Sequence, residues 1–243
     1  MAPSLAASVV EGDLGKSPER AFLEWSDMPV AAASIGQVHR ATTRDGRDVA
    51  VKVQYPGVHG AIESDLDAAE VMYAMFSSLM LKGLDANALV DELRGRMREE
   101  LDYRLEASNV AEFEALFSGH PWVRIPRLVP EYSTERLLTT EWVDGLTFDE
   151  FRTTASDDTK QRAAEVVWRF AQRAIHRAGV FNGDPHPGNY RFHRDGSVTF
   201  LDYGLVKRWG TDEWETLKPA MDAIIIDRDP ELHDRNKETS GRT

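Results

Sequence analysis

Residues 181–206, FNGDPHPGNYRFHRDGSVTFLDYGLV, are predicted to form a hairpin with polar side chains at its open end, around which the rest of the chain is organised. Tyr190–His193 and Val198–Leu201 are typical of strands, and Asp195-Gly196 supplies a positive-φ turn between them. A two-residue turn would pair Asn189 directly with Asp202, with Cα atoms about 4.5–5.5 Å apart. An amide oxygen and a carboxylate are therefore expected to meet at the end of one rigid ribbon.

Asp184 lies five residues before Asn189, and a turn over residues 185–188 can return it to the same place. Two carboxylates and an amide oxygen suit Mg²⁺ and its phosphates rather than Zn²⁺ or copper. The order Asp-x₄-Asn, hairpin, Asp-x-Gly is the spacing of a protein-kinase catalytic centre, in which the first Asp acts on the acceptor and the other two residues hold the metal. Each residue type is also common in ordinary turns. The complete set at this spacing favours a catalytic site over an ordinary turn.

Length and composition indicate a globular protein with a sizeable core. The 243 residues are 42% hydrophobic and 29% charged, and the net charge of −12 argues against binding nucleic acid or docking tightly on anionic lipid. Cysteine is absent, which excludes disulfide and thiol chemistry. Residues 1–16 are expected to be a loose start without a secretory signal, and the longest uncharged apolar run, residues 71–81, is too short to span a membrane. These features predict a cytoplasmic protein.

Residues 28–54 are expected to form two or three strands, the last of which carries an unusual lysine. Side chains alternate along a strand, so one face should hold Val49, Val51 and Val53 and the other should hold Ala50 and Lys52. One interpretation is a lysine that extends along a sheet edge into water. The other is an ammonium that points into a nucleotide cleft, where Ala50 leaves room for an adenine ring.

An alanine-rich segment, Ala31-Ala32-Ala33-Ser34-Ile35-Gly36, precedes this lysine where a kinase would carry its glycine-rich phosphate loop. No G-x-G-x-x-G occurs in the chain. Small side chains still allow a close approach of the backbone to phosphate, although alanine lacks the φ freedom of glycine.

Two helices are predicted to support the site. The first, from Asp85 to about Phe117, has a buried stripe that includes Leu105. Its acidic residues Glu99, Glu100, Asp102 and Glu106 form a cluster that offers a partner to Lys52, with Glu99 itself expected on the solvated face. The second, Asp157–Arg177, follows a capping box at residues 147–150. Glu141-Trp142-Val143-Asp144-Gly145 marks a boundary between domains 1–144 and 145–243.

Six strings carry a family resemblance: AAASIGQVHRA, VAVKVQYPGV, ELDYRLEASN, EWVDG, DPHPGN and LDYG. With these strings, which cover most of residues 28–206, the chain resembles the UbiB/AarF family of atypical kinases. The resemblance implies an α+β, two-lobed protein-kinase-like fold. Its N-lobe would hold an antiparallel sheet plus long helices, and its mainly helical C-lobe would be truncated. The resemblance also implies binding of ATP or ADP with Mg²⁺ and a role in isoprenoid-quinone (ubiquinone) biosynthesis at the periphery of a membrane. Quinone-biosynthesis proteins or lipid-like precursors would be the partners.

The resemblance assigns roles to individual residues. The catalytic group would be Asp184 with the ion pair of Lys52 and Glu106, and Lys52 would contact the α- and β-phosphates. Asn189 and Asp202 would hold the metal. Glu141 to Val143 would be the hinge against adenine, and Glu100 and Asp102 match a Glu-x-Asp motif. The nucleotide-binding residues would be Ala31, Ala32, Ala33, Ser34, Ile35, Gly36, Val38, Ala50, Lys52, Glu141 and Val143.

The chain departs from the family pattern in three places. An upstream Lys-x-Gly-Gln helix is missing, Phe181-Asn182-Gly183 stands where the family has a His-Ala pair, and the C-terminal helices are absent. We therefore expect the core of a longer protein or a truncated member. The apolar stripe of helix 157–177 would then lie bare and promote self-association.

Three functions fit these motifs. The first is a Mg²⁺-dependent phosphotransferase or ATPase. The second is a pseudokinase-like regulatory module that binds nucleotide without turnover. The third is a small-molecule phosphotransferase of the aminoglycoside or choline kinase type. The alanine-rich segment argues against this third function.

Overall fold

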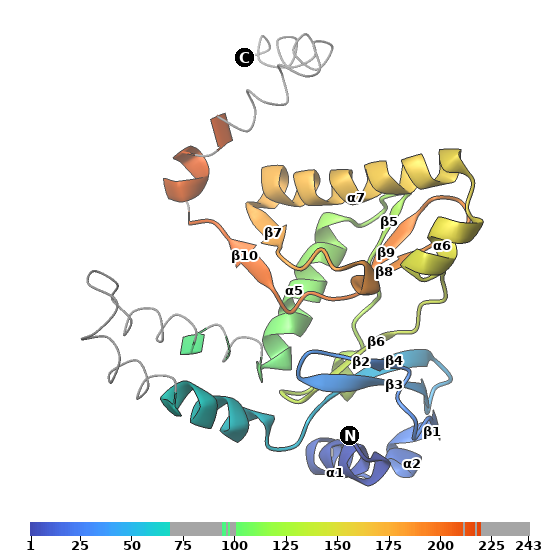
Figure 1. Ribbon diagram of the computed structural model, residues 1–243. Helices are drawn as coiled ribbons and strands as arrows, with labels where there is room; N and C mark the ends of the chain where they lie inside the picture. Colours follow the sequence, from blue (N-terminus) through green and yellow to red (C-terminus); the bar gives the residue numbers. More distant parts are fainter. Residues whose placement is uncertain (69–93, 96, 98–100, 211, 217, 220–243) are drawn as a thin grey trace.

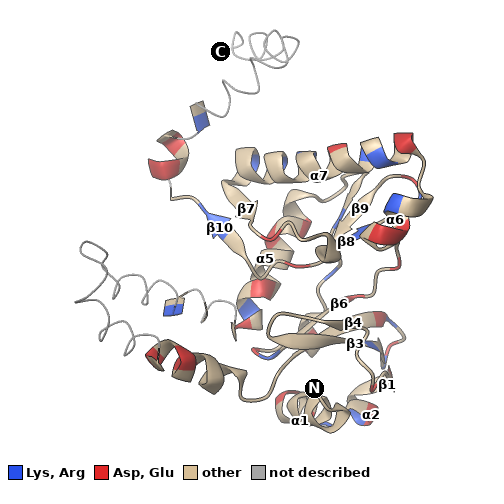
Figure 2. Ribbon diagram, viewed as in Figure 1, with Lys and Arg blue, Asp and Glu red and all other residues tan. Residues whose placement is uncertain are grey.

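The computed structural model describes residues 1–68, 94, 95, 97, 101–210, 212–216, 218 and 219. They form a lower, sheet-rich lobe and an upper lobe of helices and short strands, joined by residues 141–145 (Figure 1). In the ribbon of Figure 2, the positions of acidic and basic residues are interspersed along both lobes of this part of the chain.

The N-lobe is built on an antiparallel sheet in the order β1-β3-β4-β6. The strands are β1 (Phe22–Trp25), β3 (Gly36–Thr43), β4 (Asp48–Gln54) and β6 (Leu137–Glu141), and a short β2 (Ala31–Ala32) pairs with β3. Val49, Val51 and Val53 of β4 are fully buried on one face, and Lys52, opposite Val38 and Leu138, is on the other. The predicted alternation along this strand is confirmed.

The outer face of the sheet is covered by α1 (Pro3–Leu14), followed by α2 (Pro18–Ala21) (Figure 1). The expected loose start is therefore wrong. Ala6, Val9 and Val10 are buried against the valine face of β4, and Asp13 forms an ion pair with Arg136 just before β6. The hydrophobic periodicity of this segment is weak, and the burial of its apolar side chains against the sheet stabilises the helix.

Helix α5 (Tyr103–Leu116) begins later than predicted. Asp102 is its N-cap and accepts a hydrogen bond from the amide of Arg104, so the helix phase is set from this residue. Tyr103, Glu106, Val110 and Phe113 form the buried face, whereas Leu105 is 45% exposed. The prediction that Leu105 belongs to the buried stripe is wrong for this reason. Most of the predicted helix before Leu101, Glu99 and Glu100 included, lies outside the described residues.

Helix α5 also completes the core of the upper lobe. Phe113 and Phe117 pack against Phe170 of α7 (Asp157–Ala178), and the ring of Phe170 stacks on Phe200 at 3.7 Å. The apolar stripe of α7 is therefore buried at Val166, Phe170, Ala174 and Ile175, and the expectation of a bare stripe is wrong. A helix assigned to the first domain by sequence supplies the missing cover. Self-association and a division at residue 144 remain predictions.

The central hairpin consists of β8 (Tyr190–Phe192) and β9 (Val198–Phe200), with β5 (Val123–Arg124) parallel to β9. Tyr190 pairs with Phe200, so the register differs by one residue from the predicted one. The amide of His193 bonds to the Ser197 carbonyl around a three-residue turn that ends at Gly196, where φ is 86°. The two-residue turn was therefore wrong, because the Asp195 carboxylate accepts from both the amide and the hydroxyl of Ser197 and stabilises the longer loop.

The remaining elements connect these parts. The capping box predicted at Thr147 and Glu150 is present and opens α6. Strand β7 pairs antiparallel with β10, and Asn182 lies opposite Val206. The bounds are η1 (Pro130–Tyr132), α6 (Phe148–Thr154), β7 (Val180–Asn182), η2 (Pro187–Asn189) and β10 (Val206–Arg208), and residues 58–68 are helical.

Candidate active site

A cavity of about 570 Å³ lies between the two lobes. Its N-lobe wall is formed by the alanine-rich segment and the cleft face of β4, and its rear is formed by residues 141–143. Its C-lobe wall is formed by residues between 184 and 206. Every predicted catalytic, nucleotide-binding and metal-binding residue lines this cavity except Gly36, whereas Asp102 of the Glu-x-Asp motif does not. The predicted ones are Ala31, Ala32, Ala33, Ser34, Ile35, Val38, Ala50, Lys52, Glu106, Glu141, Val143, Asp184, Asn189 and Asp202.

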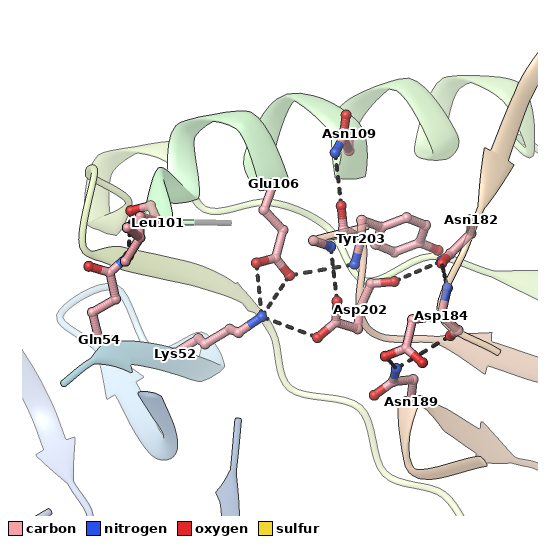
Figure 3. A network of polar contacts seen from close by, with 11 residues as sticks. Lys52, Gln54, Leu101, Glu106, Asn109, Asn182, Asp184, Asn189, Asp202 and Tyr203 are labelled. Carbon is pink, nitrogen blue, oxygen red and sulfur yellow. Dashed lines mark hydrogen bonds and ion pairs between the residues drawn. The ribbon is translucent and has the colours of Figure 1, made fainter. Parts of the chain in front are cut away.

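Lys52 stands between two carboxylates at the inner end of the cleft (Figure 3). Its Nζ donates to both oxygens of Glu106 at 2.9 and 2.8 Å and to Asp202 Oδ2 at 3.1 Å. The side chains of Lys52 and Glu106 are only 13% and 5% exposed. Burial opposes the charged form of Lys52, but the carboxylates of Glu106 and Asp202 outweigh it and raise the pKa of the ammonium above its usual value. The lysine is thus held charged and aimed into the cleft.

Glu106 is fixed from the helix side by contacts that the sequence did not suggest. Burial raises the pKa of the Glu106 carboxyl, and the adjacent Lys52 ammonium partly offsets that rise. The amide of Tyr203 donates to Glu106 Oε1 at 3.5 Å, and Asn109 Nδ2 donates to the Tyr203 carbonyl at 2.8 Å. Asn109 lies three residues after Glu106, one turn further along α5, and that spacing is the only sequence signal for its role.

Asp184 and Asn189 face each other on the C-lobe wall. Asn189 Nδ2 donates to Asp184 Oδ2 at 2.7 Å, which leaves the amide oxygen of Asn189 without a hydrogen-bond partner among the described residues. Asn182 joins the two acidic positions, because its Nδ2 donates to the Asp202 carbonyl at 2.8 Å and its Oδ1 accepts from the Asp184 amide at 3.2 Å. The segment that departs from the family pattern therefore contributes a structural link within the site.

The donor set fits a magnesium–nucleotide ligand. The Asn189 amide oxygen and the Asp202 carboxylate are hard oxygen ligands, and Lys52 supplies a positive charge beside them. At the rear of the cleft the Val143 amide donates to no other group in the part of the chain that the structure describes, so it is available to a base edge. Trp142 is held beneath the Arg40 guanidinium, 4.7 Å from its ring centre, which ties this hinge to β3.

Gly36 has a packing role rather than a place in the cavity wall. A Cβ atom at this position would lie 2.3 Å from the Val53 carbonyl oxygen and 3.0 Å from the Tyr103 hydroxyl. The glycine therefore lets β3 pass close to β4 below the alanine segment. Its assignment to the nucleotide-binding set rested on its place in the loop, whereas its environment is the sheet.

We expect Gly36→Ala to lower the free energy of unfolding by about 1–3 kcal/mol, because the added methyl group cannot avoid backbone atoms. Urea denaturation measures the change. Gly60→Ala is the matched control, since a Cβ at residue 60 meets nothing within 4 Å. Equal stability of the two variants would contradict the close packing at Gly36.

Two lobes around a cleft, a lysine–glutamate pair between them and an Asp-x₄-Asn hairpin followed by Asp-x-Gly define a protein of the protein-kinase-like class. The chain belongs to the ABC1 atypical kinase-like family, whose domain profile matches residues 1–232. The resemblance to the UbiB/AarF family and the two-lobed α+β fold are thereby confirmed.

Individual relatives agree with this assignment. The chain is 36% identical over 211 residues to the protein ACTIVITY OF BC1 COMPLEX KINASE 1, chloroplastic, of Arabidopsis thaliana, covering 83% of this chain and 30% of the relative. It is 33% identical over 205 residues to the atypical kinase COQ8, mitochondrial, of Saccharomyces cerevisiae, covering 84% and 40%. The solved complex of Rv3197 with erythromycin from Mycobacterium tuberculosis superimposes with a TM-score of 0.74 at 37% identity, covering 86% of this chain and 52% of that chain.

The chain thus spans less than half the length of these two curated relatives. Their names place the two relatives in the chloroplast and the mitochondrion, so the family is not confined to the cytoplasm. Among the described residues, no helix is both long and apolar enough to cross a membrane.

Proposed function

We propose that the protein is an atypical kinase or ATPase that binds Mg-ATP or Mg-ADP in the cleft between its lobes. The observation that carries this proposal is the position of Lys52. Its ammonium contacts Glu106 of α5 and Asp202 of the Asp-x-Gly motif, and the same cavity is lined by Asp184 and Asn189. A buried cation beside metal-type oxygen ligands is the arrangement that a nucleotide phosphate chain needs.

Each residue has a defined task in this proposal. Lys52, oriented by Glu106, would hold the phosphate oxygens, and the Val143 amide would bind the base edge. Asn189 and Asp202 would hold Mg²⁺, which when bound supplies positive charge next to the phosphates. Asp184 would accept the proton of the acceptor hydroxyl or of a water molecule. Its hydrogen bond from Asn189 keeps its carboxylate oriented beside the metal-binding position.

The biological role that we propose is support of isoprenoid-quinone biosynthesis at the periphery of a membrane. Membership of the ABC1 family and similarity to COQ8 support it. Quinone-biosynthesis proteins or lipid-like precursors are the partners that fit this role. The alanine segment lines the cavity where a phosphate loop is expected, and its small side chains would let its backbone approach the phosphates.

We expect Mg-ATP or Mg-ADP to stabilise the folded protein by about 2.7 kcal/mol when the ligand is present at a hundred times its Kd. For a chain of this length the melting temperature should rise by roughly 5–10 °C. Differential scanning fluorimetry measures the shift, EDTA should abolish it, and a phosphate-release assay on the same sample measures turnover. Absence of any shift at millimolar Mg-nucleotide in a folded sample would contradict the proposal. A shift without phosphate release from any acceptor would favour the pseudokinase-like module.

A further inference from the structure

Arg191 is a basic residue in the lining of the cleft, a feature that none of the kinase-type roles above uses. It lies in β8 between Tyr190 and Phe192, whose rings pack into the upper-lobe core. Because side chains alternate along a strand, Arg191 is on the opposite face, where it lines the cavity together with Gly188 and Asn189. Its charged neighbour is Glu150 of α6: hydrogen bonds from Thr147, and to a smaller extent the Arg191 charge, lower the pKa of the Glu150 carboxyl. Among the described residues no hydrogen bond joins Arg191 to that carboxylate.

The protein holds this side chain in one place. Arg191 Nη1 donates to the Tyr190 carbonyl at 3.0 Å and to the Gly188 carbonyl at 3.4 Å. Among the described residues, Nε and Nη2 of Arg191 donate to no protein atom, so the remaining N–H groups of its fork are free for a ligand. One edge of the guanidinium is therefore anchored and the other is open.

The end of the hinge is shaped around the same arginine. A Cβ atom at Gly145 would lie 2.9 Å from Cβ of Arg191, so only glycine lets the chain pass there without a shift. Arg191 thus spans from the last residue of the hinge segment to Gly188 of the catalytic loop. The base end of the proposed nucleotide lies at residues 141–143, and its phosphate end lies at Lys52 and Asp202. Arg191 lines the same cavity and, among the described residues, is hydrogen-bonded to neither set.

We propose that Arg191 donates hydrogen bonds to the ribose hydroxyl groups of the bound nucleotide and thereby selects ribonucleotides over deoxyribonucleotides. The inference rests on the proposed function and adds the residue that recognises the ribose. Phosphate is the less suitable partner, because Lys52 and the metal ligands already serve that end of the cleft. A charge-assisted hydrogen bond to a ribose hydroxyl corresponds to about tenfold in affinity.

The test compares the Kd values of Mg-ATP, Mg-2′-deoxyATP, Mg-3′-deoxyATP and adenosine by isothermal titration calorimetry on the full chain. The unchanged protein should bind ATP about tenfold more tightly than at least one of the deoxy analogues. The Arg191→Met variant should bind ATP as weakly as the unchanged protein binds that deoxy analogue, and it should no longer discriminate between the two nucleotides. The Arg191→Lys variant should retain part of this discrimination. Arg194→Met is the matched control, since Arg194 is an exposed arginine in the turn of the same hairpin.

The outcomes separate this inference from the proposed function. No binding of any nucleotide by the unchanged protein, with folding verified by circular dichroism, overturns the proposed function and this inference together. Binding of ATP and both deoxy analogues with equal affinity overturns the role of Arg191 alone. If Arg191→Met weakens ATP binding but leaves adenosine binding unchanged, the arginine contacts phosphate and the sugar-reading role is wrong. Equal loss of adenosine and ATP binding, together with loss of discrimination, supports it.

Discussion

Lys52→Met is expected to lower the free energy of unfolding by about 3–5 kcal/mol at pH 7, because it leaves the Glu106 carboxylate buried without its partner. Glu106 is 5% exposed, and within the described residues its other contact is the 3.5 Å hydrogen bond from the Tyr203 amide. Urea denaturation followed by circular dichroism measures the loss. Lys207→Met, at an exposed position of β10, is the matched control and should change stability little.

The pH dependence of the Lys52→Met variant identifies Glu106 as the cause. Burial raises the pKa of Glu106 above its ordinary value of 4.5, so the unpaired group is tolerated when protonated. The stability deficit should therefore be smallest below pH 4.5 and should grow as the pH rises through the folded-state pKa toward neutrality. Adding Glu106→Gln to the variant should recover part of the loss at pH 7. A deficit that does not change with pH, or that the second substitution does not reduce, would contradict this account.

The two aspartates that line the cleft are expected to respond differently to removal of their charge. In the proposed function Asp184 acts on the acceptor, so Asp184→Asn should lower kcat by about 10²–10⁴-fold and leave the Kd of Mg-nucleotide nearly unchanged. Asp202→Asn should weaken Mg-nucleotide binding, because it removes the charge of the proposed metal ligand and the second carboxylate bonded to Lys52. Calorimetric Kd values and phosphate-release rates for both variants measure the difference.

Asp195→Asn serves as the control for this pair, since Asp195 is an exposed carboxylate in the hairpin turn, bonded to Ser197. It should lose some stability without a specific effect on Kd or kcat. An equal loss of nucleotide affinity in Asp184→Asn and Asp202→Asn would mean that Asp184 is a metal ligand or a structural residue. The assignment of roles to the two aspartates would then be wrong.

Several features of the cleft could be predicted from the sequence because they depend on local periodicity. Alternation along β4 is enough to separate Lys52 from the buried valines, and the capping box at Thr147 and Glu150 needs only the residues that form it. The Asp-x₄-Asn segment and the Asp-x-Gly motif are brought together by a hairpin with a short turn, so their proximity is also a local property. The predicted strand register was wrong by one residue, but this did not affect the prediction that both motifs share one cavity.

Three other features depended on packing between distant segments. Pro3 in the first turn and Gly15 as the left-handed C-cap mark the ends of α1, but its burial against the valine face of β4 depends on a distant strand. Leu105 and Glu106 are neighbours in sequence, and the contacts of Glu106 with the distant Lys52 and Tyr203 show that Glu106 faces the interior. Phe113 and Phe117 belong to the first domain by sequence but pack against Phe170 of α7 in the upper lobe. No local sequence pattern indicates this contact.

The class of fold was predicted through the resemblance of six strings spread over residues 28–206, whereas the lysine strand and the order of the Asp-x₄-Asn and Asp-x-Gly motifs follow from residues close together along the chain. Only the tertiary structure decided that Lys52 contacts both Glu106 and Asp202, that Asn182 links the two acidic positions and that Gly36 belongs to the sheet. It also placed Arg191 between the hinge and the catalytic loop. The physical reason is that burial, ion pairing and close backbone approach are set by partners as far as 150 residues away in the chain, as for Lys52 and Asp202.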